Sequence, residues 1–230
     1  MRAGGGWPAG PSRSGSAPAV RPARRPRRPP AADPAASGDI AVENPATGEV
    51  IAHVPDMDAE QVAALVRTAR AAQPGWEALG FEGRGRILRR MQKWVVDNSE
   101  RIIRTVVAET GKAYEDAQIT DWAYGASAFG FWAKEAEGYL ADEKVKSSAV
   151  LVKGKKLLVR YRSLGLIGVI GPWNYPFTNS FGDCIPALAA GNSVILKPSE
   201  VTPLTSLKLA EGLRACGVPD GVFQVATGQG

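Results

Sequence analysis

The sequence predicts an α/β protein in which a helical N-terminal region is followed by a protruding β-hairpin and a partial parallel sheet. Apolar residues recur at helical spacing through much of residues 58–138. Three short apolar runs then alternate with helical segments over residues 166–226, which is typical of parallel strands joined by right-handed crossovers. Two β-type runs around Lys153–Gly154 separate these regions and predict the hairpin. We therefore expect the last segment to be a parallel α/β unit.

Residues 1–38 are expected to form a disordered, Arg/Pro-rich tail. They hold seven Arg, one acidic residue (Asp33) and eight of the 17 Pro, and too few bulky apolar residues to build a core. The tail lacks the apolar segment of a secretory signal. Organellar targeting and nucleic-acid contact are alternatives, but a solvated extension is favoured. An initiation codon placed too far upstream would give the same sequence.

The composition argues against several functional classes. The net charge of +5 comes from the tail, since the remaining residues carry 21 basic and 22 acidic side chains, so a basic nucleic-acid-binding fold is not indicated. No apolar run reaches the roughly 18–20 residues that span a membrane. Two Cys and one His argue against a disulfide framework, a metal site and Ser–His–Asp chemistry. This sparse use of cysteine favours the reducing cytoplasm.

The N-terminal part of the body, residues 39–144, is predicted to begin with two short strands and to continue as helices. Asn44–Pro45 supplies turn chemistry between the strands. Asp58 and Gln61 form a capping-box pattern at the first helix, and Gly111 stands where the third helix is expected to end. The apolar positions expected to face the core are Val62, Leu65, Val66 and Ala69, then Ile87, Leu88, Met91 and Val95, then Ile102, Ile103, Val106 and Val107, and, in a fourth helix over about residues 113–138, Ile119, Trp122, Ala126 and Phe129.

The remaining segments are predicted to form a hairpin over residues 145–163, from AVLVKGKKLLVRYR, and a parallel α/β unit over residues 164–230. Leu166–Gly171 is a short apolar run of the kind that forms a strand buried on both faces. Further strands are expected at Asn192–Leu196 and Val222–Ala226, and helices at Asn179–Ala190, broken or kinked at Pro186, and from Thr202–Pro203 to Gly217.

Three unusual segments follow the three predicted parallel strands: GPWNYP, KPSE and GQG. Because ligands of open parallel sheets bind at the carboxyl ends of the strands, these segments indicate a binding site. The usual GxGxxG fingerprint is absent after the first strand. Glu200 can accept hydrogen bonds from ribose hydroxyls, and Lys197 and Ser199 can donate to ribose or phosphate oxygens. The alternative is that KPSE is only a turn, with Glu200 near the start of the next helix.

Several motifs, taken together, identify the family that this chain resembles. GVIGPWNYPF, IPALAAGNSVILKPSEVTPL and GVPDGVFQVATGQG follow one another near the end of the chain, and NPATGEVI and AETGK stand upstream. This set resembles the NAD(P)-dependent aldehyde dehydrogenase superfamily over about residues 40–230. Some details are similar to its succinate-semialdehyde-dehydrogenase-like branch. The resemblance implies an incomplete aldehyde dehydrogenase fold, in which residues 164–230 are the first half of a Rossmann-like, dinucleotide-binding sheet.

The resemblance also implies a reaction: oxidation of an aldehyde to a carboxylic acid with NAD(P) as hydride acceptor. A Cys thiolate attacks the aldehyde, hydrogen-bond donors hold the oxyanion, and a Glu-activated water hydrolyses the thioester. Asn174 matches the side-chain amide of the oxyanion hole. The positions that match cofactor contacts are Ile170, Gly171, Pro172, Trp173, Lys197, Ser199, Glu200 and Gly230.

The choice of cofactor depends on the charges near the adenosine ribose. The carboxylate of Glu200 would repel a 2′-phosphate and so favours NAD, although Lys197 and Ser199 would also admit NADP. Trp173 has an alternative as a core aromatic residue. Asp183 stands where many members of the family carry Lys, which leaves the subfamily open.

The likeness ends before three functional segments of the family: its glycine-serine loop, its Glu general base and its nucleophilic Cys. Cys184 and Cys216 match none of these and are expected to be small buried hydrophobes. We therefore expect the N-terminal portion of an aldehyde dehydrogenase, inactive by itself. The alternatives are a shortened, non-catalytic nucleotide-binding or interaction protein, and a nucleic-acid-associated protein acting through its tail. In full-length form the hairpin is expected to pack against a neighbouring subunit, as it does in the family, so that a homo-oligomer results.

Overall fold

The computed structural model describes residues 38–152 and 154–229. The predictions for the tail before Gly38, for Lys153 in the hairpin and for the contact at Gly230 lie outside the described residues. The described part is a mixed α/β structure with a three-stranded parallel sheet, as the sequence predicts. Among its helices, none is long and apolar enough to cross a membrane.

An antiparallel hairpin opens the described chain. Strands β1 (Asp39–Glu43) and β2 (Val50–Pro55) pair across a turn in which the backbone oxygen of Asn44 accepts the N–H of Gly48 at 2.7 Å. Gly48 has a φ of 76°, which favours glycine. One apolar side of the hairpin packs against Leu204, at the start of a later helix. The predicted turn between two strands is confirmed.

Three helices follow: α1 (Ala59–Ala78), α2 (Gly80–Asp97) and α3 (Ser99–Thr110). The predicted capping box is present, because Asp58 accepts the N–H of Gln61 at 2.8 Å while the Gln61 side chain accepts the N–H of Asp58 at 2.9 Å. The predicted stripe of α2 is buried throughout. Gly111 ends α3 with a φ of 72°, in the left-handed conformation expected of a helix end.

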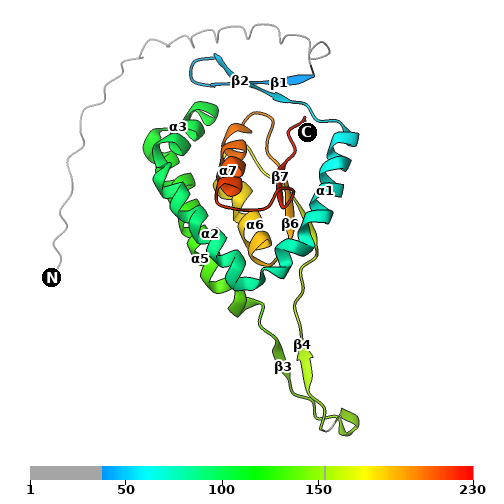
Figure 1. Ribbon diagram of the computed structural model, residues 1–230. Coiled ribbons are helices and arrows are strands. Elements are labelled where there is room, and N and C mark those ends of the chain that lie inside the picture. The colour runs from blue at the N-terminus through cyan, green and yellow to red at the C-terminus, as the bar shows by residue number, and fades with distance from the viewer. Residues whose placement is uncertain (1–37, 153, 230) are drawn as a thin grey trace, which may run out of the picture. The chain divides into compact units, whose positions relative to one another are not determined.

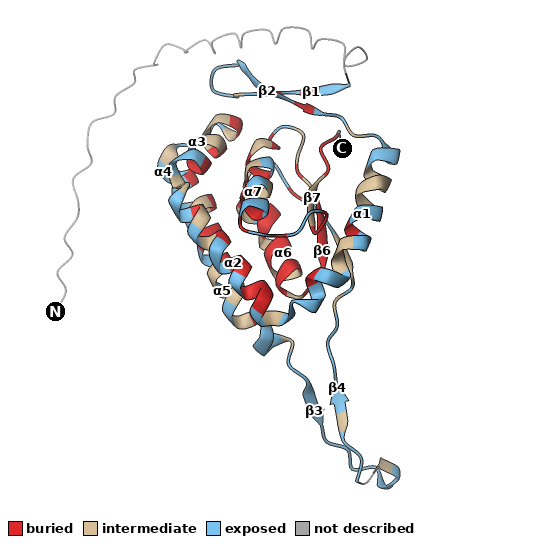
Figure 2. Cartoon of the chain, in the orientation of Figure 1, coloured by how far each residue is buried: buried red, intermediate tan, exposed pale blue. Residues whose placement is uncertain are grey.

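The fourth predicted helix is divided by a π-helical segment. Helix α4 (Tyr114–Ala117) leads into the π-helix η2 (Gln118–Ala123) and then α5 (Tyr124–Tyr139). The predicted burial of Ile119 is wrong, since its exposed fraction is 70%, whereas Asp121 is fully buried. A π-turn contains more residues than an α-turn, so the α-helical spacing assumed for this stripe fails here. Helices α2 and α5 pack against each other, and both carry buried as well as exposed residues (Figure 2).

The predicted hairpin is present, but its first strand lies earlier in the chain than the sequence predicts. Strand β3 (Glu143–Val145) pairs with β4 (Leu157–Val159), and the apolar run expected to form the first strand is instead the exposed 3-10 turn η3 (Val150–Val152). Next to the paired residues, Arg160 forms an ion pair with Asp142 at 2.7 Å. The hairpin projects away from the sheet and helices (Figure 1).

The parallel sheet has the order β5 (Leu166–Ile170), β6 (Ser193–Lys197), β7 (Phe223–Val225). Helices α6 (Thr178–Ala189) and α7 (Leu204–Ala215) connect the strands, and α6 continues unbroken through Pro186. Successive side chains of β6 face opposite sides, so Ile195 packs with α1 while Val194 and Leu196 pack in the main core with α6. The sheet therefore lies between α1 and the other helices.

Burial differs between the central and the outer strands. All but the last residue of β6 are buried, as predicted. The prediction that Leu166–Gly171 is buried on both faces is wrong, because β5 is an edge strand and Ile170 is 85% exposed. The apolar run alone does not distinguish an edge from a central strand.

Candidate functional site

The three parallel strands end together, which brings their following loops to one edge. Lys197 lies opposite Ile170 in the sheet, and the N–H of Gly171 donates to the backbone oxygen of Lys197 at 2.9 Å. On the other side, the N–H of Ala226 donates to the oxygen of Leu196 at 2.9 Å. The GPWNYP, KPSE and TGQG segments therefore leave the same edge of the sheet.

The GPWNYP loop is held tightly at its first residue. A Cβ added to Gly171 would lie 2.0 Å from the Oγ of Ser180 in α6, so no larger residue fits without movement. Asn174 is half-buried, and within the described residues its side-chain amide has no hydrogen-bond partner. Trp173 is 62% exposed, which contradicts the alternative that it is a core aromatic residue. Pro172 is exposed beside it.

The KPSE loop holds a small charged cluster. Lys197 Nζ lies 3.6 Å from Glu200 Oε2, and the Ser199 hydroxyl donates to the same oxygen at 3.4 Å. A hydrogen bond from its own backbone N–H, followed by the charge of Lys197, holds the pKa of Glu200 below its usual value. Glu200 is thus an anion, and about a third of its side chain is exposed. The N–H of Val201 also donates to the Ser199 hydroxyl at 3.4 Å, so the segment is a turn as well.

The structure brings some of the predicted site residues together and leaves others separate. Lys197, Ser199 and Glu200 form one cluster, and the Gly171 backbone joins it to the GPWNYP loop. Among the described residues, no hydrogen bond or ion pair links Asn174 to that cluster. A cavity of about 630 Å³ lies beside β7, lined by residues such as Leu65 and Phe223, and includes none of the predicted site residues.

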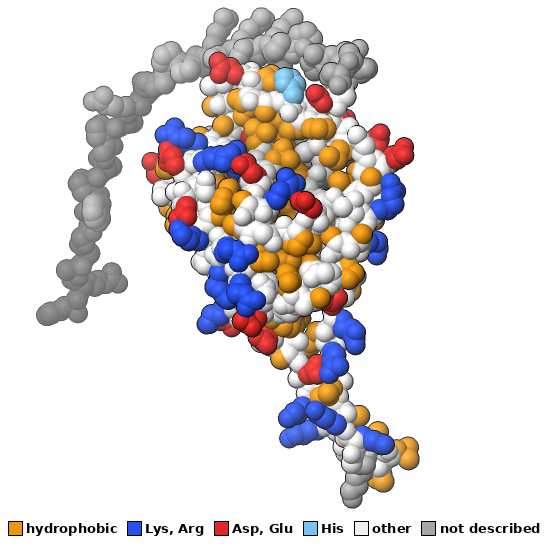
Figure 3. Space-filling view, in the orientation of Figure 1, with side chains coloured by type: hydrophobic (Ala, Val, Ile, Leu, Met, Phe, Trp, Pro, Cys, Tyr) orange, Lys and Arg blue, Asp and Glu red, His pale blue; other side chains and the backbone are white. Residues whose placement is uncertain are grey.

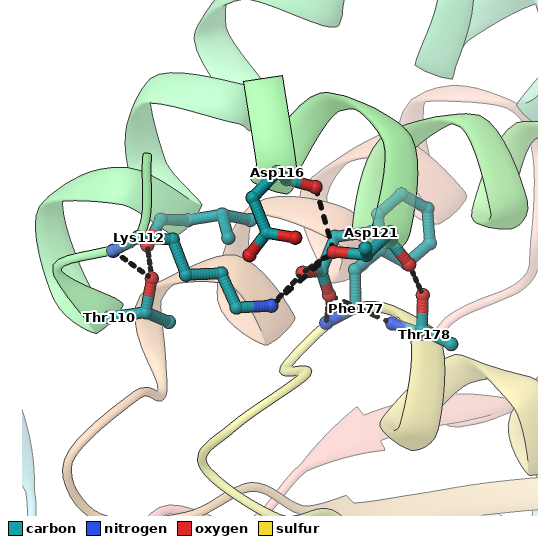
Figure 4. Close-up of polar contacts among 8 residues, drawn as sticks. Thr110, Lys112, Asp116, Asp121, Phe177 and Thr178 are labelled. Carbon is teal, nitrogen blue, oxygen red and sulfur yellow. Dashed lines mark hydrogen bonds and ion pairs between the residues drawn. The ribbon is translucent and has the colours of Figure 1, made fainter. Parts of the chain in front are cut away.

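A buried polar network lies under the GPWNYP loop (Figure 4). Asp121 Oδ1 accepts the backbone N–H groups of Phe177 at 3.1 Å and of Thr178 at 3.2 Å, at the start of α6. Asp121 Oδ2 lies 2.7 Å from Lys112 Nζ, and the Thr178 hydroxyl donates to the Thr120 backbone oxygen. Asp121 is fully buried. Sequence reasoning missed this network, because α-helical spacing places Asp121 off the predicted apolar face and the π-helix that turns it inward has no signal in that spacing.

A second buried carboxylate lies at the start of α7. Glu109, at the end of α3, accepts the N–H of Leu204 at 2.6 Å and that of Thr205 at 3.0 Å. Its exposed fraction is 2%, and burial raises its pKa to about 7. The sequence predicts the start of α7 to within two residues. It does not predict that Glu109, from α3, accepts the first N–H groups of α7. Glu109 belongs to the AETGK motif, one of the motifs that carry the family resemblance.

The two cysteines do not form a reactive site. Cys184 is fully buried and Cys216 is 7% exposed, and burial raises the pKa of both thiols. Nucleophilic cysteines need a lowered pKa and access, so neither side chain is suited to attack a substrate. Within residues 38–152 and 154–229, no group of three or more His, Cys, Asp and Glu side chains is placed to hold a metal ion.

These features define an open-sheet α/β protein with a candidate ligand-binding edge. The model of the aldehyde dehydrogenase family matches residues 33–230, and the chain belongs to this family. The betaine aldehyde dehydrogenase of Vibrio vulnificus (strain YJ016) is 36% identical over 188 residues, which are 82% of this chain and 38% of that protein. The chain thus spans well under half the length of this curated relative.

Solved structures of the family are similar as well. The crystal structure of PnpE in complex with nicotinamide adenine dinucleotide is 32% identical, with a TM-score of 0.78, covering 84% of this chain and 39% of that one. The succinate-semialdehyde dehydrogenase of Burkholderia pseudomallei is 33% identical, with a TM-score of 0.78, covering 83% of this chain and 39% of that one. The family predicted from the motifs is confirmed.

Proposed function

We propose that this chain is the N-terminal, NAD-binding part of an aldehyde dehydrogenase that oxidises an aldehyde to a carboxylic acid. The observation that carries the proposal is the hydrogen bond from Gly171 N–H to the Lys197 backbone oxygen, which joins the GPWNYP and KPSE loops at one edge of a parallel sheet. Dinucleotides bind at this place in open α/β sheets. The similar structure of PnpE, which holds NAD, supports the choice of ligand.

The residues of the KPSE loop fit the adenosine part of NAD. Glu200 is an anion with exposed surface, so it can accept hydrogen bonds from both ribose hydroxyls. Lys197 and Ser199 supply donors next to it. Because Glu200 would repel a 2′-phosphate, NAD is expected to bind more tightly than NADP, which Lys197 still allows.

On the other side of the edge, exposed apolar surface is available for the rest of the cofactor. Ile170 is 85% exposed and Trp173 62% exposed, and Pro172 lies between them in the sequence. When bound, NAD supplies the hydride acceptor for the reaction. The chain's own contribution is to bind and orient it, with Gly171 allowing the backbone to pass close to Ser180 of α6. Gly230, proposed as a further contact, lies outside the described residues.

Asn174 is proposed as the catalytic residue of this segment. Its amide is half-buried and has no hydrogen-bond partner among the described residues, so it is free to donate to the oxygen of an aldehyde under attack. The nucleophilic Cys and the Glu base of the family mechanism are not matched in this chain, and both cysteines are buried. We therefore propose that the 230-residue chain does not turn over aldehyde by itself.

The longer form of the protein is proposed to be a cytoplasmic homo-oligomer. Val150 and Leu151 at the hairpin are 83% and 95% exposed, and apolar side chains are visible on the hairpin's surface in Figure 3. Such side chains are available to pack against a second subunit. The sparse use of cysteine, with only Cys184 and Cys216 in the sequence, favours the reducing cytoplasm. The second candidate function, a non-catalytic NAD-binding protein, is supported by the same edge and the same absence of a matched nucleophile.

Calorimetric titration of the purified chain with NAD and with NADP tests the binding proposal. The wild type should bind NAD more tightly than NADP, and Glu200→Gln should weaken NAD binding about tenfold because a charged acceptor is lost. Glu137→Gln, which changes an exposed carboxylate on α5, is the matched control and should bind as the wild type does. Equal affinities of the wild type and Glu200→Gln, or no binding at all, would overturn the proposal.

A further inference from the structure

One short segment, Glu109–Asp121, contacts the helices behind both site loops. It runs from the end of α3 through α4 into the π-helix. Its first residue, Glu109, and its last, Asp121, are buried carboxylates with exposed fractions of 2% and 0%. Burying two carboxylates is costly unless each has strong hydrogen-bond or charged partners.

Both carboxylates bind the first N–H groups of crossover helices. Asp121 accepts from Phe177 and Thr178, where α6 begins directly after the GPWNYP loop. Glu109 accepts from Leu204 and Thr205, where α7 begins shortly after the KPSE loop. The two site loops therefore end at helix starts that are held by the same segment.

Neither helix can be capped by its own preceding residue. The N-cap positions are Phe177 for α6 and Pro203 for α7, and neither side chain has an acceptor. Helix starts leave N–H groups without intrahelical partners, and their partial positive charge favours an anion. The distant carboxylates replace the missing local caps. Without them, buried N–H groups would be left unpaired at the end of each loop.

The segment also contacts the GPWNYP loop through Lys112. Lys112, which forms the ion pair with Asp121, places its Nζ 3.7 Å from the centroid of the Tyr175 ring. Tyr175 is the residue after Asn174. The loop is thus held through the ring at Tyr175 and through the backbone at Phe177 and Thr178.

We infer that Glu109 and Asp121 are positioning residues, which fix the KPSE and GPWNYP loops in the geometry that binds the dinucleotide and presents Asn174. This inference rests on the proposed function for the ligand, but the loop contacts are independent of it. Each carboxylate acts on its own loop: Asp121 on residues 171–178 and Glu109 on residues 198–205.

Hydrogen–deuterium exchange of the full chain, followed by mass spectrometry of its peptides, tests the inference. Asp121→Ala should speed amide exchange at least about tenfold in peptides of residues 171–178 and leave residues 198–205 unchanged, and Glu109→Ala should do the reverse. Asp121→Asn and Glu109→Gln, which keep an acceptor oxygen, should restore part of the protection. The exposed neighbours Asp116→Ala and Glu115→Ala are the matched controls and should exchange as the wild type does.

NAD titration of the same variants provides the functional readout. Each alanine variant should bind NAD about tenfold more weakly, and the Asn and Gln variants should recover part of this loss. If an alanine variant does not fold, the corresponding Asn or Gln variant tests the positioning role by loop amide exchange and NAD titration. Exchange that rises evenly through the chain, or loops that stay protected, would overturn the inference. Failure of the wild type to bind NAD would overturn the proposed function alone, since loop exchange would still decide the positioning roles.

Discussion

The ammonium group of Lys112 lies over the ring of Tyr175, with Nζ 3.7 Å from the ring centroid. The same nitrogen is 2.7 Å from Oδ2 of the fully buried Asp121. Lys112 therefore joins a buried carboxylate to the residue that follows Asn174. Among the described residues, Lys112 is the one ion-pair partner of Asp121. Removing Lys112 alone should therefore lower the stability of the fold more than removing both charges.

Replacing Lys112 with Met should lower the free energy of unfolding by about 3–5 kcal/mol, because the Asp121 carboxylate would be left buried without its counter-ion. The double variant Lys112→Met with Asp121→Asn should be more stable than Lys112→Met alone, since the unpaired charge is gone. Urea unfolding of both variants measures the difference. Lys93→Met is the control: Lys93 pairs with Asp97 on the surface, where the loss should be about 1 kcal/mol or less. Equal losses for Lys112→Met and Lys93→Met would contradict this account.

The stability of the chain should fall between pH 5 and pH 8 because of Glu109. Burial raises its pKa from the ordinary 4.5 to about 7 in the folded chain, so the folded state binds the proton more tightly than the unfolded state. The stabilisation from this group is complete below pH 4.5 and is lost as the pH rises through 7. The expected loss is up to about 3 kcal/mol relative to Glu109→Gln, which has no such titration.

Urea unfolding of the wild type and of Glu109→Gln, at intervals from pH 5 to pH 8, measures this difference. Glu115→Gln, which changes an exposed carboxylate nearby, should keep the pH dependence of the wild type. A wild type that gains stability relative to Glu109→Gln as the pH rises would mean that the hydrogen bonds from Leu204 and Thr205 outweigh burial, and the prediction would fail.

Local patterns predicted the parts of the fold that local physics determines. The Asp58–Gln61 capping box, the Gly111 helix end and the buried stripe of α2 all depend on residues a few positions apart, and all are as expected. The meeting of the GPWNYP and KPSE loops also followed from sequence, because parallel strands joined by helices end at one edge. These features need no knowledge of distant contacts.

The features that the sequence did not predict depend on distant contacts or on a change of helical period. Asp121 binds the N–H of Phe177 from 56 positions away, and Glu109 binds that of Thr205 from 96 positions away. The burial of Asp121 also needs the π-helix, which no α-helical spacing reveals. In the hairpin, the apolar run Val150–Val152 predicts a strand, but the residues that pair with β4 are Glu143–Val145.

Gly171→Ala should destabilise the chain by about 1–3 kcal/mol, because the new Cβ would lie 2.0 Å from the Ser180 Oγ and 2.9 Å from its Cβ. Adding Ser180→Gly removes both clashing atoms and should restore part of the stability. Thermal unfolding of the single and double variants measures both effects. Gly168→Ala, in the strand β5 that precedes Gly171, is the matched control, since its added Cβ has nothing within 4 Å. A Gly171→Ala protein as stable as the Gly168→Ala protein would show that α6 can move away without cost.

Trp173→Ala should weaken NAD binding up to about tenfold while changing the free energy of unfolding by no more than about 0.5 kcal/mol. The Trp173 side chain, within the GPWNYP loop, is 62% exposed. It therefore contributes little to the core but offers an aromatic face to a ligand. Calorimetric titration with NAD and urea unfolding of the same preparation separate the two effects. Phe131→Ala, at an aromatic residue 46% exposed on α5, should lose no affinity for NAD. If Trp173→Ala and Phe131→Ala bind NAD equally well, the ligand does not contact Trp173, and the cofactor position proposed for this edge must be revised.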